Sequence, residues 1–179
     1  TLAYLDLIDF EAVRTDPKPL LGFSHISVLD LALHGQTGLV TIHSELATWG
    51  FGTWQELPEA QREALMDAYR RILTSDAPLG ALPAASEWET WRSGRAEGPL
   101  IGGLLNRILK VQATPFAVPL ERFDGAILFW EEVRAPTPTI WYDLHVLRLA
   151  GILDRIAGMV VGTPTEMENA DGPDTLREI

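Results

Sequence analysis

Residues 19–35 read PLLGFSHISVLDLALHG, and this stretch decides the class of fold. Its first part, PLLGF, is a short apolar run bounded by proline and glycine, which is typical of a buried strand. From Ile26 onward the apolar residues follow the spacing of a mostly buried helix, and Gly35 is the predicted stop of that helix. Ser24 therefore lies on a strand-to-helix turn.

The same alternation of strands and helices continues along the rest of the chain. Further strands are predicted at residues 38–43, 125–133 and 156–164, and helices at residues 57–76, 98–112 and 138–152, with a short helix or turn at 6–16 and a last helix within the acidic end, 165–179. Residues 76–97 are broken by prolines and glycines and are predicted to be a linker or excursion. This order predicts an α/β fold with a largely parallel sheet.

Composition excludes several classes of protein. The chain has 179 residues and a formal net charge of −11, which argues against binding of a nucleic-acid backbone. It has no cysteine, so disulfides, thiol nucleophiles and thiolate metal sites are excluded. No apolar run is long enough to suggest a membrane span, and the first residues lack the features of a signal peptide. The start at Thr1 suggests a trimmed product or a chain whose earlier part is missing.

Ser24 has two interpretations. At the carboxyl end of a strand its hydroxyl would stand beside the N–H groups that begin a helix, and these can stabilise a developing oxyanion. However, the hydrolase turn Gly-x-Ser-x-Gly is only half met, because Ile26 replaces the second glycine. The residues alone therefore favour a serine that caps the helix, and one serine could do both.

Glu131 and Glu132 stand where an apolar strand leaves the core. A carboxylate there could orient a histidine base, although charges often simply mark the end of a strand in solvent. No histidine is a convincing base: His25 adjoins Ser24 in sequence, and the others are His34, His43 and His145. No two histidines share a helix at ligand spacing, so no metal site is predicted.

Gly102 and Gly103 form a pair just before a predicted helix. Glycines there permit close approach of the backbone to a ligand, so both are candidate substrate-binding residues. A plain tight turn is the simpler interpretation. The pair is not a phosphate-binding loop, because the following Lys-Ser/Thr is missing.

Three stretches, in this order, resemble the LD-carboxypeptidases, which comprise the muramoyltetrapeptide carboxypeptidases and the microcin C self-immunity peptidases. They are PKPLLGFSHISVLDLALHGQTGLVTIHS, GPLIGGLL and GAILFWEEVRAPTPTIWYDLHVLRLAGILDRIAGMVVG. The resemblance extends from Tyr4 to Thr163 and is weakest from Gly50 to Arg95.

The resemblance implies a serine peptidase with a Ser-Glu-His triad and no metal or other cofactor. Ser24 would be the nucleophile, Glu131 would orient the base, and the backbone N–H of His25 would be an oxyanion donor. The implied reaction, in the cytoplasm, cuts the L–D amide bond at the C-terminus of a murein tetrapeptide, or a related amide of an aminoacyl nucleotide. Residues 1–75 would end a Rossmann-like N-terminal domain, and 98–179 would form part of a mixed α/β C-terminal domain. A homodimer is left open.

The chain departs from the family pattern at several positions. His25 replaces an aspartate, His43-Ser44-Glu45 replaces His-Gly-Pro, and Leu104 replaces the asparagine of Gly-Gly-Asn. The family's histidine would follow Ile179, so we expect a fragment whose catalytic base lies outside it. The alternative is a catalytically incomplete relative that binds a peptide or a nucleotide. Candidates to bind a substrate carboxylate are Arg92, Arg95 and Arg134.

Overall fold

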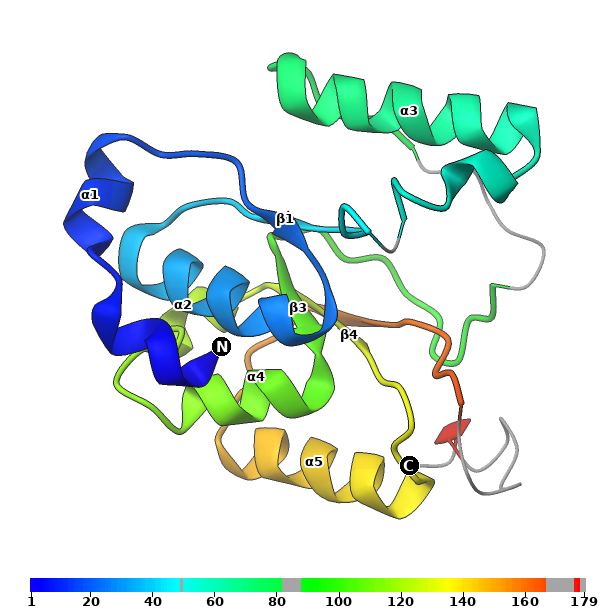
Figure 1. Ribbon diagram of the computed structural model, residues 1–179. Coiled ribbons are helices and arrows are strands. Elements are labelled where there is room, and N and C mark those ends of the chain that lie inside the picture. Colours follow the sequence, from blue (N-terminus) through cyan, green and yellow to red (C-terminus); the bar gives the residue numbers. More distant parts are fainter. Residues whose placement is uncertain (49, 82–87, 167–175, 178–179) are drawn as a thin grey trace. The chain divides into compact units, whose positions relative to one another are not determined.

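The protein has an α/β fold with two parallel sheets, as the sequence predicts. The computed structural model describes residues 1–48, 50–81, 88–166 and 176–177 (Figure 1). One sheet pairs β1 (Leu21–Gly22) with β2 (Ile42–His43). The other has the order β3-β4-β5, with bounds Leu100–Leu104, Ile127–Glu131 and Gly158–Val161. All the pairings in both sheets are parallel, so the carboxyl ends of neighbouring strands lie at a common edge.

Helices connect the strands. The α-helices are α1 (Phe10–Thr15), α2 (Ser27–Thr37), α3 (Glu59–Thr74), α4 (Leu105–Gln112) and α5 (Thr137–Leu149). Short 3₁₀ segments are η1 (Leu2–Leu7), η2 (Ser24–Ile26), η3 (Trp54–Glu56) and η4 (Leu120–Phe123). These elements confirm the predicted helices at 57–76 and 138–152 and the predicted strands at 38–43, 125–133 and 156–164, each with shorter bounds.

Two sequence predictions are wrong in detail. The helix after Ser24 does not stop at Gly35. It continues to Thr37 and ends at Gly38, which takes the left-handed conformation (φ 78°) that a helix C-terminus favours. Gly35 lies inside α2, where a Cβ would come within 2.9 Å of the Ala117 carbonyl oxygen. Gly35 is therefore explained by close packing.

The second error concerns residues 98–112. The sequence predicts a glycine turn that leads into a helix, but residues 100–104 form β3, and the glycine pair lies inside that strand. Glycine weakens a strand on intrinsic preference, so a local pattern misses it. The parallel pairing of β3 with β4 places Gly102 opposite Phe129, and this register is a tertiary property.

The chain divides into two compact units, which are residues 1–43 with 94–179, and residues 44–93. This grouping differs from the predicted boundaries at residues 75 and 98. The first unit has one core, in which Val28 and Leu31 of α2 are buried in the same cluster as Ile101, Leu128 and Trp130. Within it α4 lies between α2 and α5 (Figure 1).

The second unit is built around three aromatic rings. Phe51, Trp54 and Tyr69 lie 4.5–5.3 Å apart between ring centroids. Glu45 joins the cluster, since the Trp54 indole N–H donates to its carboxylate (2.5 Å) and its backbone N–H donates to the Tyr69 hydroxyl (3.1 Å). Helix α3 has no buried residue, and its Tyr69 ring joins it to this aromatic cluster.

The predicted last helix, within residues 165–179, lies largely outside the described residues. In the part of the chain that the structure describes, no helix is long and apolar enough to cross a membrane.

Candidate functional site

Ser24 occupies a strained turn between β1 and α2. Its φ of 58° is in the left-handed region, which residues other than glycine seldom adopt. Gly22 permits the sharp turn, because a Cβ there would lie only 2.6 Å from the Ile26 side chain. Neither η2 nor α2 has a side-chain cap, so the interpretation of Ser24 as a helix cap is wrong. Strain of this kind gathers at functional sites, and the hydrolase nucleophile turn is one example.

The start of α2 docks on the end of β3. The Leu104 backbone N–H donates to the Ser27 hydroxyl (3.1 Å), and Ser27 is fully buried. A Cβ on Gly103 would lie 2.6 Å from the Ser27 Oγ, and a Cβ on Gly102 would lie 1.7 Å from the Phe129 carbonyl oxygen. Internal packing therefore accounts for both glycines, and their role in substrate binding stays a prediction.

The adjacent glutamates at the end of β4 have different environments. Glu132 is 2% exposed and accepts hydrogen bonds from the backbone N–H groups of Asn106 (3.3 Å) and Val133 (3.0 Å). It thus satisfies a donor in the first turn of α4. Burial raises the pKa of the Glu132 carboxyl above its ordinary value. Glu131 points elsewhere, and its side chain is 33% exposed. Of the two, Glu131 is the carboxylate that is accessible for chemistry.

His43 brings the two sheets together at their carboxyl ends. In the first sheet His43 pairs with Gly22, and Gly22 precedes Ser24 by two residues. Its Nε2 lies 3.4 Å from Oε1 of Glu131 in the second sheet. Leu104, which is held by Ser27, is also the partner of Glu131 in the register of β3 and β4. These contacts bring the turn that carries Ser24 and the end of β4 to the same edge of the first unit.

The other three histidines have different partners. The His25 ring accepts a hydrogen bond from the Arg107 guanidinium (2.9 Å to Nε2), and Arg107 holds the pKa of His25 below its ordinary value. The Nδ1 of His34 lies 3.2 Å from the Leu39 carbonyl oxygen, and that of His145 lies 2.9 Å from the Trp141 carbonyl oxygen. Among the described residues, no group of His, Asp and Glu side chains is arranged to hold a metal ion.

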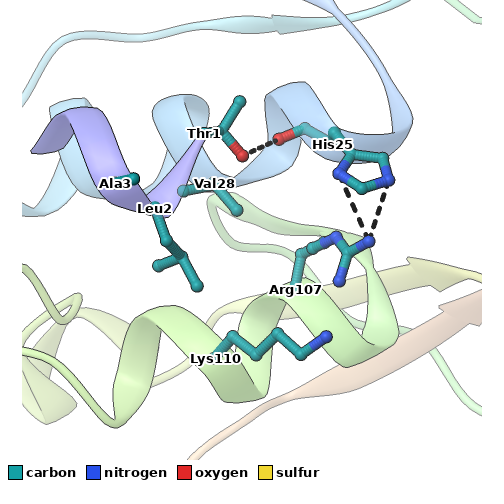
Figure 2. A pocket seen from close by; sticks show the side chains of 7 residues that line it. All are labelled: Thr1, Leu2, Ala3, His25, Val28, Arg107 and Lys110. Atoms are coloured by element: carbon teal, nitrogen blue, oxygen red, sulfur yellow. Dashed lines mark hydrogen bonds between the residues drawn. The ribbon is translucent and has the colours of Figure 1, made fainter.

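A pocket of about 360 Å³ lies beside His25 (Figure 2). It is lined by residues 1–3, by His25 and Val28, and by two cationic residues of α4, Arg107 and Lys110. Figure 2 shows the guanidinium of Arg107 turned toward the His25 ring. The Thr1 hydroxyl donates a hydrogen bond to the His25 carbonyl oxygen (3.1 Å). The spacing of Arg107 and Lys110 puts both side chains on one face of a helix, so the sequence carries a signal for a basic side of this pocket. Neither residue is among the sites predicted from the sequence.

The role of Arg92, Arg95 and Arg134 in binding a substrate carboxylate stays a prediction. Arg134 pairs with Glu166, while Arg92 and Arg95 are exposed. Arg92 belongs to the second unit and Arg95 to the first.

Two family models match the chain. The LD-carboxypeptidase N-terminal domain matches residues 1–44, and the LD-carboxypeptidase C-terminal domain matches residues 97–179. The two models describe the two domains of one family of carboxypeptidases. The chain belongs to the LD-carboxypeptidase family.

Individual relatives agree with this assignment. A "Probable murein peptide carboxypeptidase" of Bacillus subtilis is 31% identical over 157 residues, which are 86% of this chain and 46% of the relative. The microcin C7 self-immunity protein MccF of Escherichia coli is 25% identical over 88% of this chain and 51% of its own length. This chain spans about half the length of the curated relatives that it matches.

Solved structures share the fold. An MccF-like protein from Bacillus anthracis has a TM-score of 0.79 at 26% identity, over 98% of this chain and 57% of that one. A structure of microcin C7 self-immunity protein MccF with aspartyl sulfamoyl adenosine has a TM-score of 0.74 at 20% identity, over 97% of this chain and 58% of that one.

Proposed function

We propose that this chain carries the nucleophile and the acidic residue of an LD-carboxypeptidase-type serine hydrolase. Ser24 is the nucleophile and Glu131 is the acid that orients the base. The observation that carries the proposal is the left-handed backbone of Ser24 on the turn between β1 and α2. The contacts of Ser27 with Leu104 and of His43 with Glu131 support it, because they bring this turn to the end of β4.

In the proposed reaction the Ser24 hydroxyl attacks the carbonyl carbon of the scissile amide. A histidine takes the hydroxyl proton as the new C–O bond forms and returns a proton to the leaving amine as the C–N bond breaks. Water then releases the acyl group from Ser24 through the same base. The backbone N–H of His25 is the proposed donor to the developing oxyanion.

The base in this proposal is a histidine in the part of the relatives' length that this chain does not span. The environments of the four histidines support this assignment. His25 accepts a hydrogen bond from Arg107, which opposes its protonation, and His34 and His145 face backbone carbonyl oxygens. His43 faces Glu131, and no hydrogen bond joins its ring to the Ser24 hydroxyl in the described residues.

The proposed substrate is a small peptide or an aminoacyl-nucleotide amide. One relative is named a murein peptide carboxypeptidase, and another was solved with aspartyl sulfamoyl adenosine. We propose the L–D amide bond at the C-terminus of a murein tetrapeptide, cut in the cytoplasm, or the aminoacyl-nucleotide amide. The basic residues Arg107 and Lys110 near His25 suit a substrate that carries a carboxylate or phosphate.

A second candidate function is a binding module without catalysis. By the resemblance, Leu104 replaces the asparagine of the family's Gly-Gly-Asn, and a leucine side chain has no amide. A relative that lacks this group could keep the peptide or nucleotide ligand and lose the reaction.

A serine-directed fluorophosphonate probe separates the two functions. We expect the complete gene product to be labelled, Ser24→Ala to lose the label, and Ser93→Ala to keep it as an exposed serine control. The same proteins should then be assayed with a murein tetrapeptide that ends in a D-amino acid and with aspartyl sulfamoyl adenosine.

Each result has a clear meaning. Hydrolysis of either substrate by the unaltered protein, lost in Ser24→Ala, supports the peptidase. Label that persists in Ser24→Ala contradicts the nucleophile assignment, because another serine is then the reactive one. No label on the unaltered protein, with retained ligand binding, contradicts the assignment as well and favours the binding module.

A further inference from the structure

A cluster of polar side chains, of which Asp30 is buried and His43 and Glu131 are half-buried, lies at the end of β4. His43 from β2 meets Glu131 from β4, with 3.4 Å between Nε2 and Oε1. Asp30, from the buried face of α2, is 5% exposed and lies close enough for His43 to influence its titration. The cluster therefore joins three elements of the first unit, at the edge where the Ser24 turn meets β4.

The polar atoms of this cluster are poorly satisfied. Both carboxyl oxygens of Asp30, Nδ1 of His43 and Oε1 of Glu131 are buried without a hydrogen bond of good geometry. A buried polar atom without a partner costs about 1–3 kcal/mol, and native proteins contain few of them. Four such atoms in one place require a reason other than stability.

The His43 ring is held by packing. It lies edge-on against the ring of Phe129, with centroids 5.3 Å apart and an interplanar angle of 62°. Phe129 is on β4, two residues before Glu131. The same strand therefore supplies the ring that packs against His43 and the carboxylate that faces it. The 3.4 Å separation from Oε1 needs only a small movement to become a hydrogen bond.

We propose that His43 is a positioning residue for Glu131. Its Nε2–H donates to Oε1 and fixes the carboxylate, which leaves Oε2 for the histidine that acts as base. The described residues make this contact to Oε1 alone, so the other oxygen stays available. The inference rests on the proposed role of Glu131.

Asp30 is the second carboxyl group that faces His43. Burial raises the pKa of Asp30 to about 7, while His43 and the Thr41 side chain act in the opposite direction. Glu132 is turned toward the backbone of α4 and takes no part. Of the residues that the structure describes, Asp30 and Glu131 are the titratable groups that interact with His43, and the Thr41 hydroxyl interacts with Asp30.

The first test measures the contact itself and needs no activity. In the complete gene product, two-bond ¹⁵N–¹H spectra of the histidine rings report which ring nitrogen carries the proton. We expect His43 to carry a proton on Nε2, and Glu131→Met to change its Nε2 signal. Glu131→Gln is a second variant of nearly unchanged shape. A bare Nε2, or a His43 signal that neither variant alters, would overturn the proposal.

The second test is kinetic and uses a matched pair of variants. Glutamine can place an amide N–H near the position of Nε2, whereas methionine has similar size and no donor. We expect His43→Met to lower kcat by about 10- to 100-fold, as loss of an orienting partner does elsewhere, with KM nearly unchanged. The acid limb of kcat/KM should move to higher pH in His43→Met. His43→Gln should restore most of kcat.

The two tests also separate this proposal from the proposed function. If the spectra show the contact and the unaltered protein hydrolyses nothing, the peptidase assignment fails while the His43–Glu131 contact stands. If the protein is active and both His43 variants keep full kcat and the original pH profile, the positioning role is refuted and the peptidase assignment stands.

Discussion

Two neighbouring regions of the first unit are built on opposite principles. At the edge where β1, β2 and β4 end, Ser24 has a strained backbone, and His43 and Glu131 carry buried polar atoms without hydrogen bonds. In the neighbouring region, where β3 leads into α4, Gly102 packs at close range against the Phe129 backbone. There Glu132 accepts hydrogen bonds from two backbone N–H groups. Where β3 leads into α4, Oδ1 of Asn106 is also buried without a hydrogen bond, but a left-handed residue other than glycine and four such atoms come together at the edge. This concentration supports the proposed site at the edge.

The largest effect is expected at the edge. Ser24→Ala should lower kcat at least about 10³-fold, because removal of a hydrolase nucleophile leaves only binding and oxyanion stabilisation. Its free energy of unfolding should stay within about 0.5 kcal/mol, since Ser24 caps no helix. The rate of ester or amide hydrolysis by the complete gene product measures kcat, and its urea unfolding measures the free energy of unfolding. A folded Ser24→Ala with full activity would remove the contrast between the regions.

The packed region should respond in stability. Gly102→Ala places a Cβ 1.7 Å from the Phe129 carbonyl oxygen, so β3 and β4 must separate. We expect a loss of about 3 kcal/mol or more in the free energy of unfolding, as for severe overpacking. Gly94→Ala is the control, because a Cβ there meets no atom within 4 Å. Equal unfolding curves for the two variants would contradict the packing described for β3.

The adjacent glutamates offer the sharpest comparison. Glu131→Gln should lower kcat by about 10²-fold or more and leave stability nearly unchanged, because the orienting charge is lost. Glu132→Gln should cost about 1 kcal/mol of stability, because one strong acceptor of backbone N–H groups is weakened, and the activity of the folded variant should stay within about threefold. Measurements of kcat and of urea unfolding on both variants test this comparison. The reverse pattern would show that Glu132, and not Glu131, is the carboxylate that orients the base.

The last prediction concerns a pH dependence of stability at Asp30. The pKa of this carboxyl is about 7 in the folded protein and 3.8 by its ordinary value, so between these values the folded state holds a proton that the unfolded state has lost. The free energy of unfolding therefore falls as pH rises through this window. Asp30→Asn lacks this titration and should gain stability relative to the unaltered protein by about 2 kcal/mol from pH 5 to pH 8. Urea unfolding at both values measures it, and a difference independent of pH would show that Asp30 titrates normally.

Much of the fold could be predicted because its signals are local. Short apolar runs and helical patterns identify β2, β4, β5, α3 and α5, and an apolar run followed at once by helical spacing locates the Gly22-Phe23-Ser24 turn. The strand β3 was missed because two glycines oppose a strand on intrinsic preference, and only its register beside Phe129 explains them. The end of α2 was placed at the wrong glycine because Gly35 serves packing and Gly38 serves the left-handed C-terminus.

The candidate site divides in the same way. By itself the sequence determined the strand-to-helix turn at Ser24, the carboxylate pair at the end of β4 and, through the order of its motifs, the resemblance to the LD-carboxypeptidases. Only the tertiary structure decided that Ser24 caps no helix, that Glu132 is buried under α4 while Glu131 faces His43, and that Arg107 holds the His25 ring. The physical reason is that periodicity and turn chemistry depend on neighbours in sequence, whereas burial, hydrogen-bond partners and pKa shifts depend on neighbours in space.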